Sequence, residues 1–238
     1  TPNHPTPGPP MWNDFVQIFL LVLTGLLPLV NPPGAALIML GLVPDLAPHE
    51  RARLAWSVAF NSLLMLAVSI SVGAYVLSFF GISIPVLRLA GGLVIAITGW
   101  KLLNTPPHVD HSATARQAAA EASAADTGDD DQWRGQLFYP LTLPITVGPG
   151  SIAVAIALGT SSPKEGPMAV HVIAAGCALL VLAVLIYLCM RYAGHLKRVL
   201  GATGTQVTLR LLAFVILCIG VQIGWLGVSE LLATLPRA

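Results

Sequence analysis

Charged side chains are scarce in this sequence, and the scarcity excludes an ordinary soluble domain. Asp, Glu, Lys and Arg make up 10% of the 238 residues, whereas a soluble domain carries about 25%. Hydrophobic residues make up 55%, and the mean hydropathy is +0.77. The few charges lie between long apolar runs, which is typical of a chain that crosses a bilayer several times.

Other features that the sequence lacks exclude further classes of protein. The net charge is +1 and there is no basic arm, so we expect no nucleic-acid partner. The three cysteines, Cys177, Cys189 and Cys218, lie inside apolar runs and show neither metal-ligand spacing nor a disulfide framework. There is no HExxH motif, and Ser151 has no nucleophile motif around it. We therefore expect no enzymatic activity, no cofactor and no metal site.

Long apolar runs are what the sequence does contain. They extend over about Phe15–Val43, Leu54–Phe80, Ile82–Leu103, Leu137–Thr160, Met168–Tyr192 and Val207–Leu232. About 20 apolar residues are enough for a helix to cross the hydrocarbon core. The runs therefore predict an all-α, polytopic membrane protein with about six transmembrane helices.

Proline and glycine interrupt the first and fourth runs at matching positions. With an offset of 116 residues, Pro33 falls on Pro149 and Gly34 falls on Gly150, and an earlier proline in each run also matches. Three spans per half is an odd number, so the second half must enter the membrane from the opposite side. The pattern predicts two inverted-topology three-helix repeats, each with a broken first helix, as in many secondary transporters.

The expected organisation has four parts. A disordered Pro-rich lead covers residues 1–13, the first three-helix repeat covers 14–103, a disordered cytoplasmic linker covers 104–136, and the second repeat covers 137–238. Lys and Arg concentrate in the connections that follow the first, third and fifth runs. Because basic connections stay in the cytoplasm, we expect a multi-pass inner-membrane protein with both termini outside the cytoplasm.

Several segments resemble the MarC family of bacterial and archaeal integral membrane proteins. They are LLPLVNPPGAALIML, FGISIPVLRLAGGLVIAITGWKLL and LPITVGPGSIAVAIAL, together with the Glu50-Arg51 pair. The resemblance covers nearly the whole chain outside the lead and the linker. One departure is Val147, which stands before Gly-Pro-Gly where the family usually has Ala. The resemblance implies a six-span protein, and some similar members are described as transporters of small neutral amino acids.

The two interruptions supply the candidate substrate site. An interrupted helix presents N–H groups and partial positive charge at the start of its second part, which suits a carboxylate. No Asp or Glu lies deep in any run, so a small zwitterion or an anion fits better than a cation. The candidate substrate-binding residues at the interruptions are Asn31, Pro33, Gly34, Ala35, Thr146, Gly148, Pro149, Gly150 and Ser151.

Arg88 and Arg210 lie at matching positions in the third and sixth runs and are also candidate substrate-binding residues. Two interpretations stay open for them. The side chains could snorkel to lipid headgroups, or they could act as gate or scaffold cations that hold freed carbonyls or meet a substrate carboxylate. Glu230, near the outer end of the sixth run, is expected to be solvated.

The sequence therefore predicts a secondary transporter of small neutral amino acids or similar small metabolites. Its expected partners are the small-molecule substrate, with or without a coupling proton or sodium ion, and the lipid bilayer. An exporter or channel for small anions and a non-transporting membrane scaffold remain the alternatives. A homo-oligomer, the direction of transport and the substrate itself are left open.

Overall fold

Seven α-helices and no strand form the part of the chain that the structure describes, residues 11–42, 46–104, 146–160 and 167–233. In this computed structural model the helices are α1 (Met11–Val30), α2 (Pro32–Leu42), α3 (Pro48–Phe79), α4 (Ile84–Asn104), α7 (Pro149–Thr160), α8 (Met168–Arg191) and α9 (Ala193–Ala233). The prediction of an all-α fold is confirmed for these residues.

Five stretches are long and apolar enough to cross a membrane. They are Met11–Leu40, which joins α1 and α2, then α3, α4, α8 and the Thr203–Ala233 part of α9. The fourth predicted run is represented by the short helix α7, because its first residues lie outside the described part. The polytopic membrane architecture is thus confirmed, with five long candidate spans described rather than six.

Some helix boundaries differ from the predicted runs. The helix α3 begins at Pro48, because a proline suits the first turn and Glu50 accepts a hydrogen bond from the Ala47 N–H at 3.0 Å. The helix α9 begins at Ala193 and changes direction at Gly201, whose φ is 64°. Most of the predicted lead over 1–13 and nearly all of the predicted linker over 104–136 lie outside the described residues.

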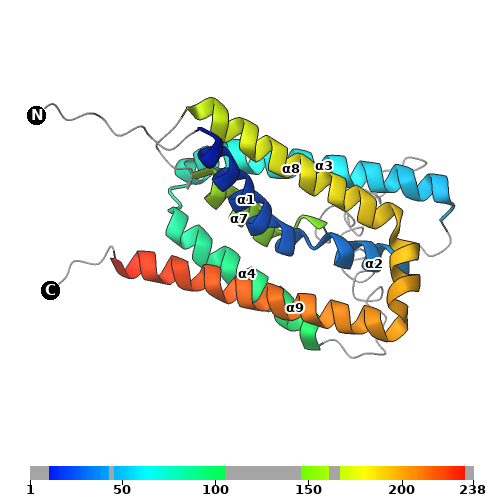
Figure 1. The fold of residues 1–238 in the computed structure, drawn as a ribbon. Helices are drawn as coiled ribbons and strands as arrows, with labels where there is room; N and C mark the ends of the chain where they lie inside the picture. The colour runs from blue at the N-terminus through cyan, green and yellow to red at the C-terminus, as the bar shows by residue number, and fades with distance from the viewer. Residues whose placement is uncertain (1–10, 43–45, 105–145, 161–166, 234–238) are drawn as a thin grey trace, which may run out of the picture.

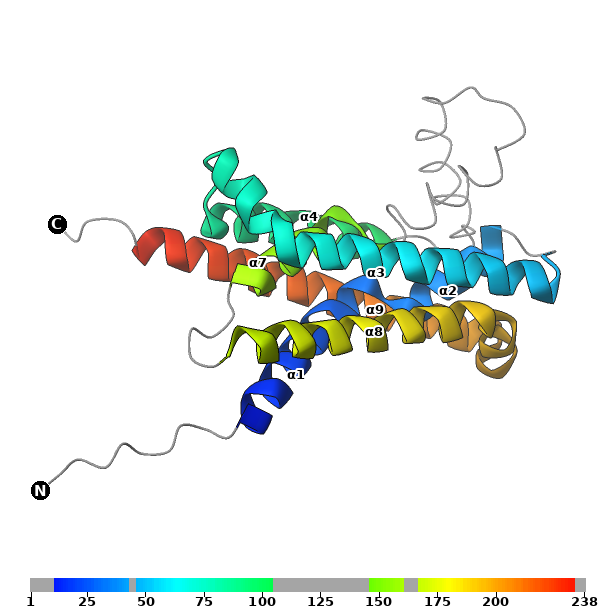
Figure 2. The same cartoon turned by 90° about the horizontal axis from the view of Figure 1, so that it is seen from above.

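Two pairs of long helices flank the broken ones (Figure 1). The helices α4 and α9 lie side by side along one edge, and α3 packs on α8 along the other. Between these pairs, α1 contacts α7 and α8, α2 contacts α8 and α9, and α7 contacts α3 and α4. The view from above shows α3, α8 and most of α9 running along one long axis, with α1 inclined to them (Figure 2). The interrupted helices therefore contact both pairs of long helices.

The backbones of α4 and α9 touch directly at small residues. A Cβ atom added to Gly92 would lie 2.3 Å from the backbone nitrogen of Gly224, and one added to Gly220 would lie 2.3 Å from that of Ala96. Helices in lipid gain little from hydrophobic burial against one another, so close packing through small residues holds them together. Glycine is required at these two positions because no side chain fits between the backbones.

The outer faces of the helices are apolar. Large hydrophobic side chains are exposed along the length of α3, α8 and α9, for example Leu64, Val68, Leu180, Val184 and Phe214. A water-soluble monomer rarely exposes contiguous apolar patches of this kind. This exposed apolar surface is suited to contact with the hydrocarbon chains of lipids, in agreement with the predicted membrane location.

Basic side chains gather at one end of the bundle. This is the end where α3 and α9 begin and where α4 and α8 finish, on the right in Figure 1. The residues are Arg51, Arg53, Lys101, Arg191, Lys197 and Arg198. The start of α1 and the finish of α9 both lie at the opposite end (Figure 1).

Candidate functional site

A single asparagine ends α1 and begins α2. Asn31 has a φ of 45°, a left-handed conformation that asparagine tolerates better than most residues. Its N–H donates to the Leu27 carbonyl at 3.0 Å, and its Oδ1 accepts a hydrogen bond from the Gly34 N–H at 3.1 Å. Pro32 and Pro33 follow it at the first two positions of α2, where a missing N–H costs least. The break is therefore a built N-cap.

This cap uses the amides of the first break. The Gly34 N–H is held by Asn31 Oδ1, and the Ala35 N–H donates to the Asn31 carbonyl at 2.9 Å. Pro33 has no N–H. A Cβ on Gly34 would lie 2.2 Å from Asn31 Nδ2, so glycine is needed for the cap to close. In this structure the amides of Gly34 and Ala35 therefore already have acceptors within the chain, and their role in substrate binding stays a prediction.

The second break has a different residue at the turn. Val147 stands at the position that matches Asn31, and its side chain is fully buried. The helix α7 begins at Pro149, and the Ile152 N–H donates to the Gly148 carbonyl at 3.1 Å. The amides before that bond belong to the first helical turn, which has no intrahelical acceptors. The two breaks therefore differ in the residue at the turn, which is a capping asparagine in the first and a buried valine in the second.

Two buried hydroxyls and a buried glycine surround the start of α7. The side chains of Thr146 and Ser151 are 1% and 3% exposed. Ser151 Oγ donates to the Gly148 carbonyl at 3.0 Å. A Cβ on Gly150 would lie 2.2 Å from Cγ1 of Ile95 on α4. The amides of Gly150 and Ser151 thus lie among polar groups that the fold has buried.

Both breaks belong to one hydrophobic core. Val30 and Ala35, on either side of the first break, are in the same buried cluster as Val147 at the second. The helix α7 also packs on α1, where a Cβ on Gly25 would lie 3.3 Å from a methyl carbon of Leu158. The structure therefore places residues of both interruptions in the same buried core.

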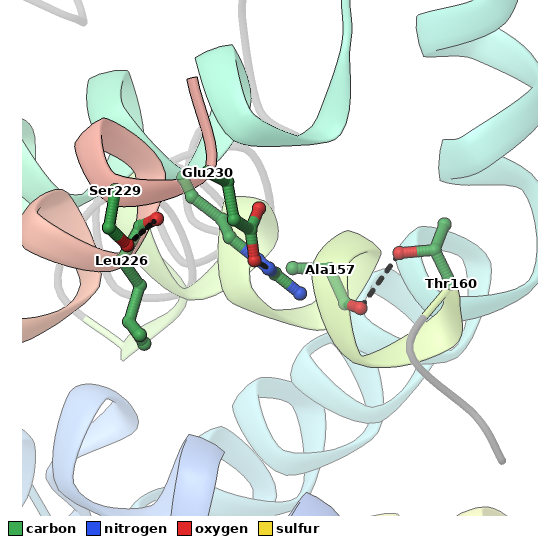
Figure 3. A network of polar contacts seen from close by, with 6 residues as sticks. Ala157, Thr160, Leu226, Ser229 and Glu230 are labelled. Atoms are coloured by element: carbon green, nitrogen blue, oxygen red, sulfur yellow. Dashed lines mark hydrogen bonds and ion pairs between the residues drawn. The ribbon is translucent and has the colours of Figure 1, made fainter. Parts of the chain in front are cut away.

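Arg88 lies away from the breaks and is ion-paired. Its guanidinium contacts the Glu230 carboxylate of α9, with the two side chains 21% and 39% exposed. Figure 3 shows Glu230 close to the last turn of α7, where Thr160 Oγ1 donates to the Ala157 carbonyl at 2.8 Å. Since Arg88 precedes Ile95 by seven residues, it lies about 10 Å along α4 from the start of α7.

This ion pair corrects the expectation that Glu230 is simply solvated. Residues 88 and 230 are 142 positions apart, so their pairing follows only from the contact between α4 and α9. The Glu230 carboxylate is a partner of Arg88. The pair therefore ties two helices from different halves of the chain together beside the finish of α7.

Arg210 lies at the other end of the same helix pair. It is exposed on α9, three residues before Ala213, whose carbonyl would lie 3.0 Å from a Cβ on Gly99 near the finish of α4. Arg88 is close to the beginning of α4. The structure thus places the two arginines near opposite ends of the contact between α4 and α9, and their role in substrate binding stays a prediction.

One further group of residues was not among the sequence candidates. A shallow cavity of about 340 Å³, widely open at the surface, is lined by Ala52, Arg53, Trp56 and Tyr187 at the basic end of the bundle. The signal in the sequence was an arginine and a tryptophan three positions apart at the start of a span, where aromatic and basic residues mark the membrane interface. The contribution of Tyr187 from α8 to the cavity could be identified only from the tertiary structure.

Comparison with known proteins assigns the family. The model of the MarC family integral membrane protein matches residues 16–232. The chain is 32% identical over 223 residues to the inner membrane protein MarC of Salmonella typhimurium, covering 93% of this chain and 98% of that protein. Identity to the proteins of the same name is 32% over 224 residues in Citrobacter koseri and 30% over 223 residues in Escherichia coli O1:K1, with the same coverage. No solved structure matches the chain.

The match includes all or most of every helix described above, and the relatives are named as inner membrane proteins. Together with the five apolar helices, these findings identify the chain as a multi-pass inner membrane protein that belongs to the MarC family.

Proposed function

We propose that this protein is a secondary transporter of small neutral amino acids or similar small metabolites. The observation that carries the proposal is the pair of interrupted helices, at Asn31 and before Pro149, whose breaks lie in one buried core. A backbone interruption at membrane depth is tolerated only where protein or a watery cavity surrounds it. Paired interruptions in corresponding segments are the strongest sequence sign of a transporter binding site.

The contacts between helices support two inverted repeats. If the halves are exchanged, α2 takes the role of α7, α3 that of α8, and α4 that of α9. The contact of α2 with α9 then corresponds to that of α7 with α4, and the contact of α2 with α8 corresponds to that of α7 with α3. The helices α2 and α7 lead to opposite ends of the bundle (Figure 1). Such a pseudo-symmetric pair of units suits alternating access by rocking.

The chemistry of the second break favours a substrate with a carboxylate. The amides of Gly150 and Ser151 lie at the positive end of the α7 dipole, and the buried hydroxyls of Thr146 and Ser151 lie beside them. Asn31 keeps the first break closed in this conformation. The substrate carboxylate would therefore bind at α7.

The distribution of acidic residues favours a neutral substrate over a cationic one. The carboxylates in the described helices, Asp14, Glu50 and Glu230, all lie in a first or last helical turn. A buried cation would need a nearby carboxylate to offset the loss of its hydration. A small zwitterion can instead place its ammonium group on carbonyls freed at a break.

Uptake into proteoliposomes tests the proposal. Purified protein is reconstituted, and uptake of radiolabelled glycine and alanine is measured with and without a pH or sodium gradient. We expect saturable uptake that unlabelled neutral amino acids compete away, with the gradient dependence naming the coupling ion. Absence of uptake under every gradient by folded protein would favour a small-anion exporter or channel, or a non-transporting scaffold.

A matched pair of glycine variants tests the site. Gly150→Leu fills the contact with Ile95 at the start of α7, whereas Gly176→Leu adds the same side chain on α8 where no atom lies within 4 Å of its Cβ. We expect the first variant to lose uptake and the second to keep it, with both inserted and monodisperse. Equal uptake by the two variants would reject the second break as the binding site.

A further inference from the structure

The cavity at the basic end of the bundle is a separate site from the two breaks. It lies between α3 and α8, with Arg53 and Trp56 in the first turns of α3 and Tyr187 in the last turns of α8. Its volume of about 340 Å³ is enough for a small polar headgroup. No residue of the proposed substrate site lines it, so its function can be considered independently of transport.

Two aromatic side chains and Arg53 line this cavity, and Arg191 lies beside it against Tyr187 without being a lining residue. The rings of Trp56 and Tyr187 meet edge to face, with centroids 6.2 Å apart. Arg191 donates to the Tyr187 hydroxyl at 3.1 Å, and its guanidinium carbon is 5.9 Å from the centre of the same ring. An arginine from each helix, Arg53 and Arg191, therefore flanks one aromatic pair.

Glu50 is the described carboxylate closest in sequence to Arg53, and no ion pair is found between it and Arg53 or Arg191. Glu50, one turn before Arg53, accepts a hydrogen bond from the Ala47 N–H at 3.0 Å. The ion pair found among the described residues joins Arg88 and Glu230 at the other end of the bundle. Within the described part of the chain, the cavity therefore keeps a net positive charge.

An apolar track leads from the cavity into the membrane. On α3 the exposed side chains Phe60, Leu64 and Val68 follow Trp56 at intervals of four residues, each more than half exposed. Residues four apart lie on one face of a helix. On α8, Val184 and Leu180 precede Tyr187 and are also exposed. A positively charged head pocket thus continues into a surface that hydrocarbon chains can cover.

We propose that this cavity binds the headgroup of an anionic phospholipid. The phosphate contacts Arg53 and Arg191, the rings of Trp56 and Tyr187 lie at the level of the glycerol, and an acyl chain follows the apolar track of α3. Basic pockets between transmembrane helices recognise anionic lipids in this way, and interfacial tryptophan and tyrosine anchor helices at the same depth. The positive charge selects a lipid with net negative charge over a zwitterionic one.

Native mass spectrometry of the purified full-length protein tests this site with phosphatidylglycerol and phosphatidylcholine as probes. We expect tight binding of phosphatidylglycerol to the wild type and weaker binding of phosphatidylcholine. Arg53→Gln removes a charge-assisted contact to the phosphate and is expected to lower the affinity for phosphatidylglycerol at least about tenfold. Arg53→Lys keeps the charge and is expected to retain most of the affinity, so that a loss in Arg53→Gln is not a folding defect.

Two controls distinguish a lipid site from diffuse surface charge and from a site for a small free anion. Arg198→Gln removes the same charge from an exposed position at the same end of the bundle, and it is expected to change the affinity less than about twofold. An equal loss in Arg198→Gln and Arg53→Gln would overturn the proposal in favour of diffuse surface charge. Displacement of the lipid by inorganic phosphate alone would overturn it in favour of a small-anion site.

Discussion

The contact between α4 and α9 leads to the sharpest stability prediction. Gly220→Ala adds a Cβ that would lie 2.3 Å from the Ala96 nitrogen, 2.8 Å from its Cα and 2.8 Å from the Gly92 oxygen. All three atoms are backbone, so no side chain can rotate away. Because carbon atoms prefer to be about 3.5–4.0 Å from their neighbours, the two helices must separate by roughly 1 Å.

The magnitude follows from comparison with a glycine on the same helix. Overpacking of a tight interface costs about 1–3 kcal/mol. Gly224→Ala makes the same chemical change four residues later in α9, where its Cβ has no atom within 4 Å. The gain in helix propensity, about 1 kcal/mol for glycine to alanine, applies to both variants and cancels. Gly220→Ala should therefore be less stable than Gly224→Ala by about 1–3 kcal/mol.

The assay is reversible unfolding in mixed micelles, followed by circular dichroism as the fraction of denaturing detergent increases. The free energies of unfolding of the wild type and the two variants are extrapolated to the same reference micelle. Gly224→Ala should be about 1 kcal/mol more stable than the wild type, and Gly220→Ala should be clearly less stable than Gly224→Ala. Equal free energies for the two variants would refute the direct backbone contact of α4 with α9.

Two further predictions concern the first break and the ion pair. Asn31→Ala should lower the free energy of unfolding by about 1–2 kcal/mol, because it removes the cap and strains a positive φ. Asn31→Gly, in which glycine can adopt the same positive φ, should lower the free energy of unfolding by only about a few tenths of a kcal/mol. Identical melting temperatures for the two variants would contradict the capping role. A double-mutant cycle on Arg88→Met and Glu230→Gln should give a coupling below about 1 kcal/mol, since Glu230 is 39% exposed. This coupling should weaken in high salt, and its absence at low salt would contradict the pair.

The membrane class and the two breaks could be predicted because both depend on local composition. A long apolar run crosses a bilayer whatever its neighbours are. Proline and glycine interrupt a helix through their own backbone properties. The interruption after Val30 and the helix start at Pro149 therefore agree with the sequence pattern.

The role of Asn31 could be predicted only in part. The sequence singled it out as a residue that could orient a ligand. In the structure its Oδ1 instead accepts a hydrogen bond from the Gly34 N–H. Asparagine before two prolines is compatible with either role, and the conformation that the enclosed backbone adopts decides between them.

Contacts between residues that are far apart in the chain could not be predicted from the sequence. Arg88 and Glu230 meet only because α4 and α9 lie side by side, and Arg53 shares a cavity with Tyr187 only because α3 packs on α8. Each helix of a membrane protein is apolar on most of its surface, so hydrophobic periodicity gives little information about which face meets a neighbour.

The sequence by itself determined that the protein lies in a membrane, how many apolar runs it has and where the two interruptions are. These features depend on residues that are close together in the chain. The tertiary structure alone decided which glycines allow two backbones to touch, which break is closed by its own side chain, and which arginine pairs with a carboxylate. Those outcomes depend on the packing of helices from opposite halves of the chain, where close fit rather than hydrophobicity selects the partner.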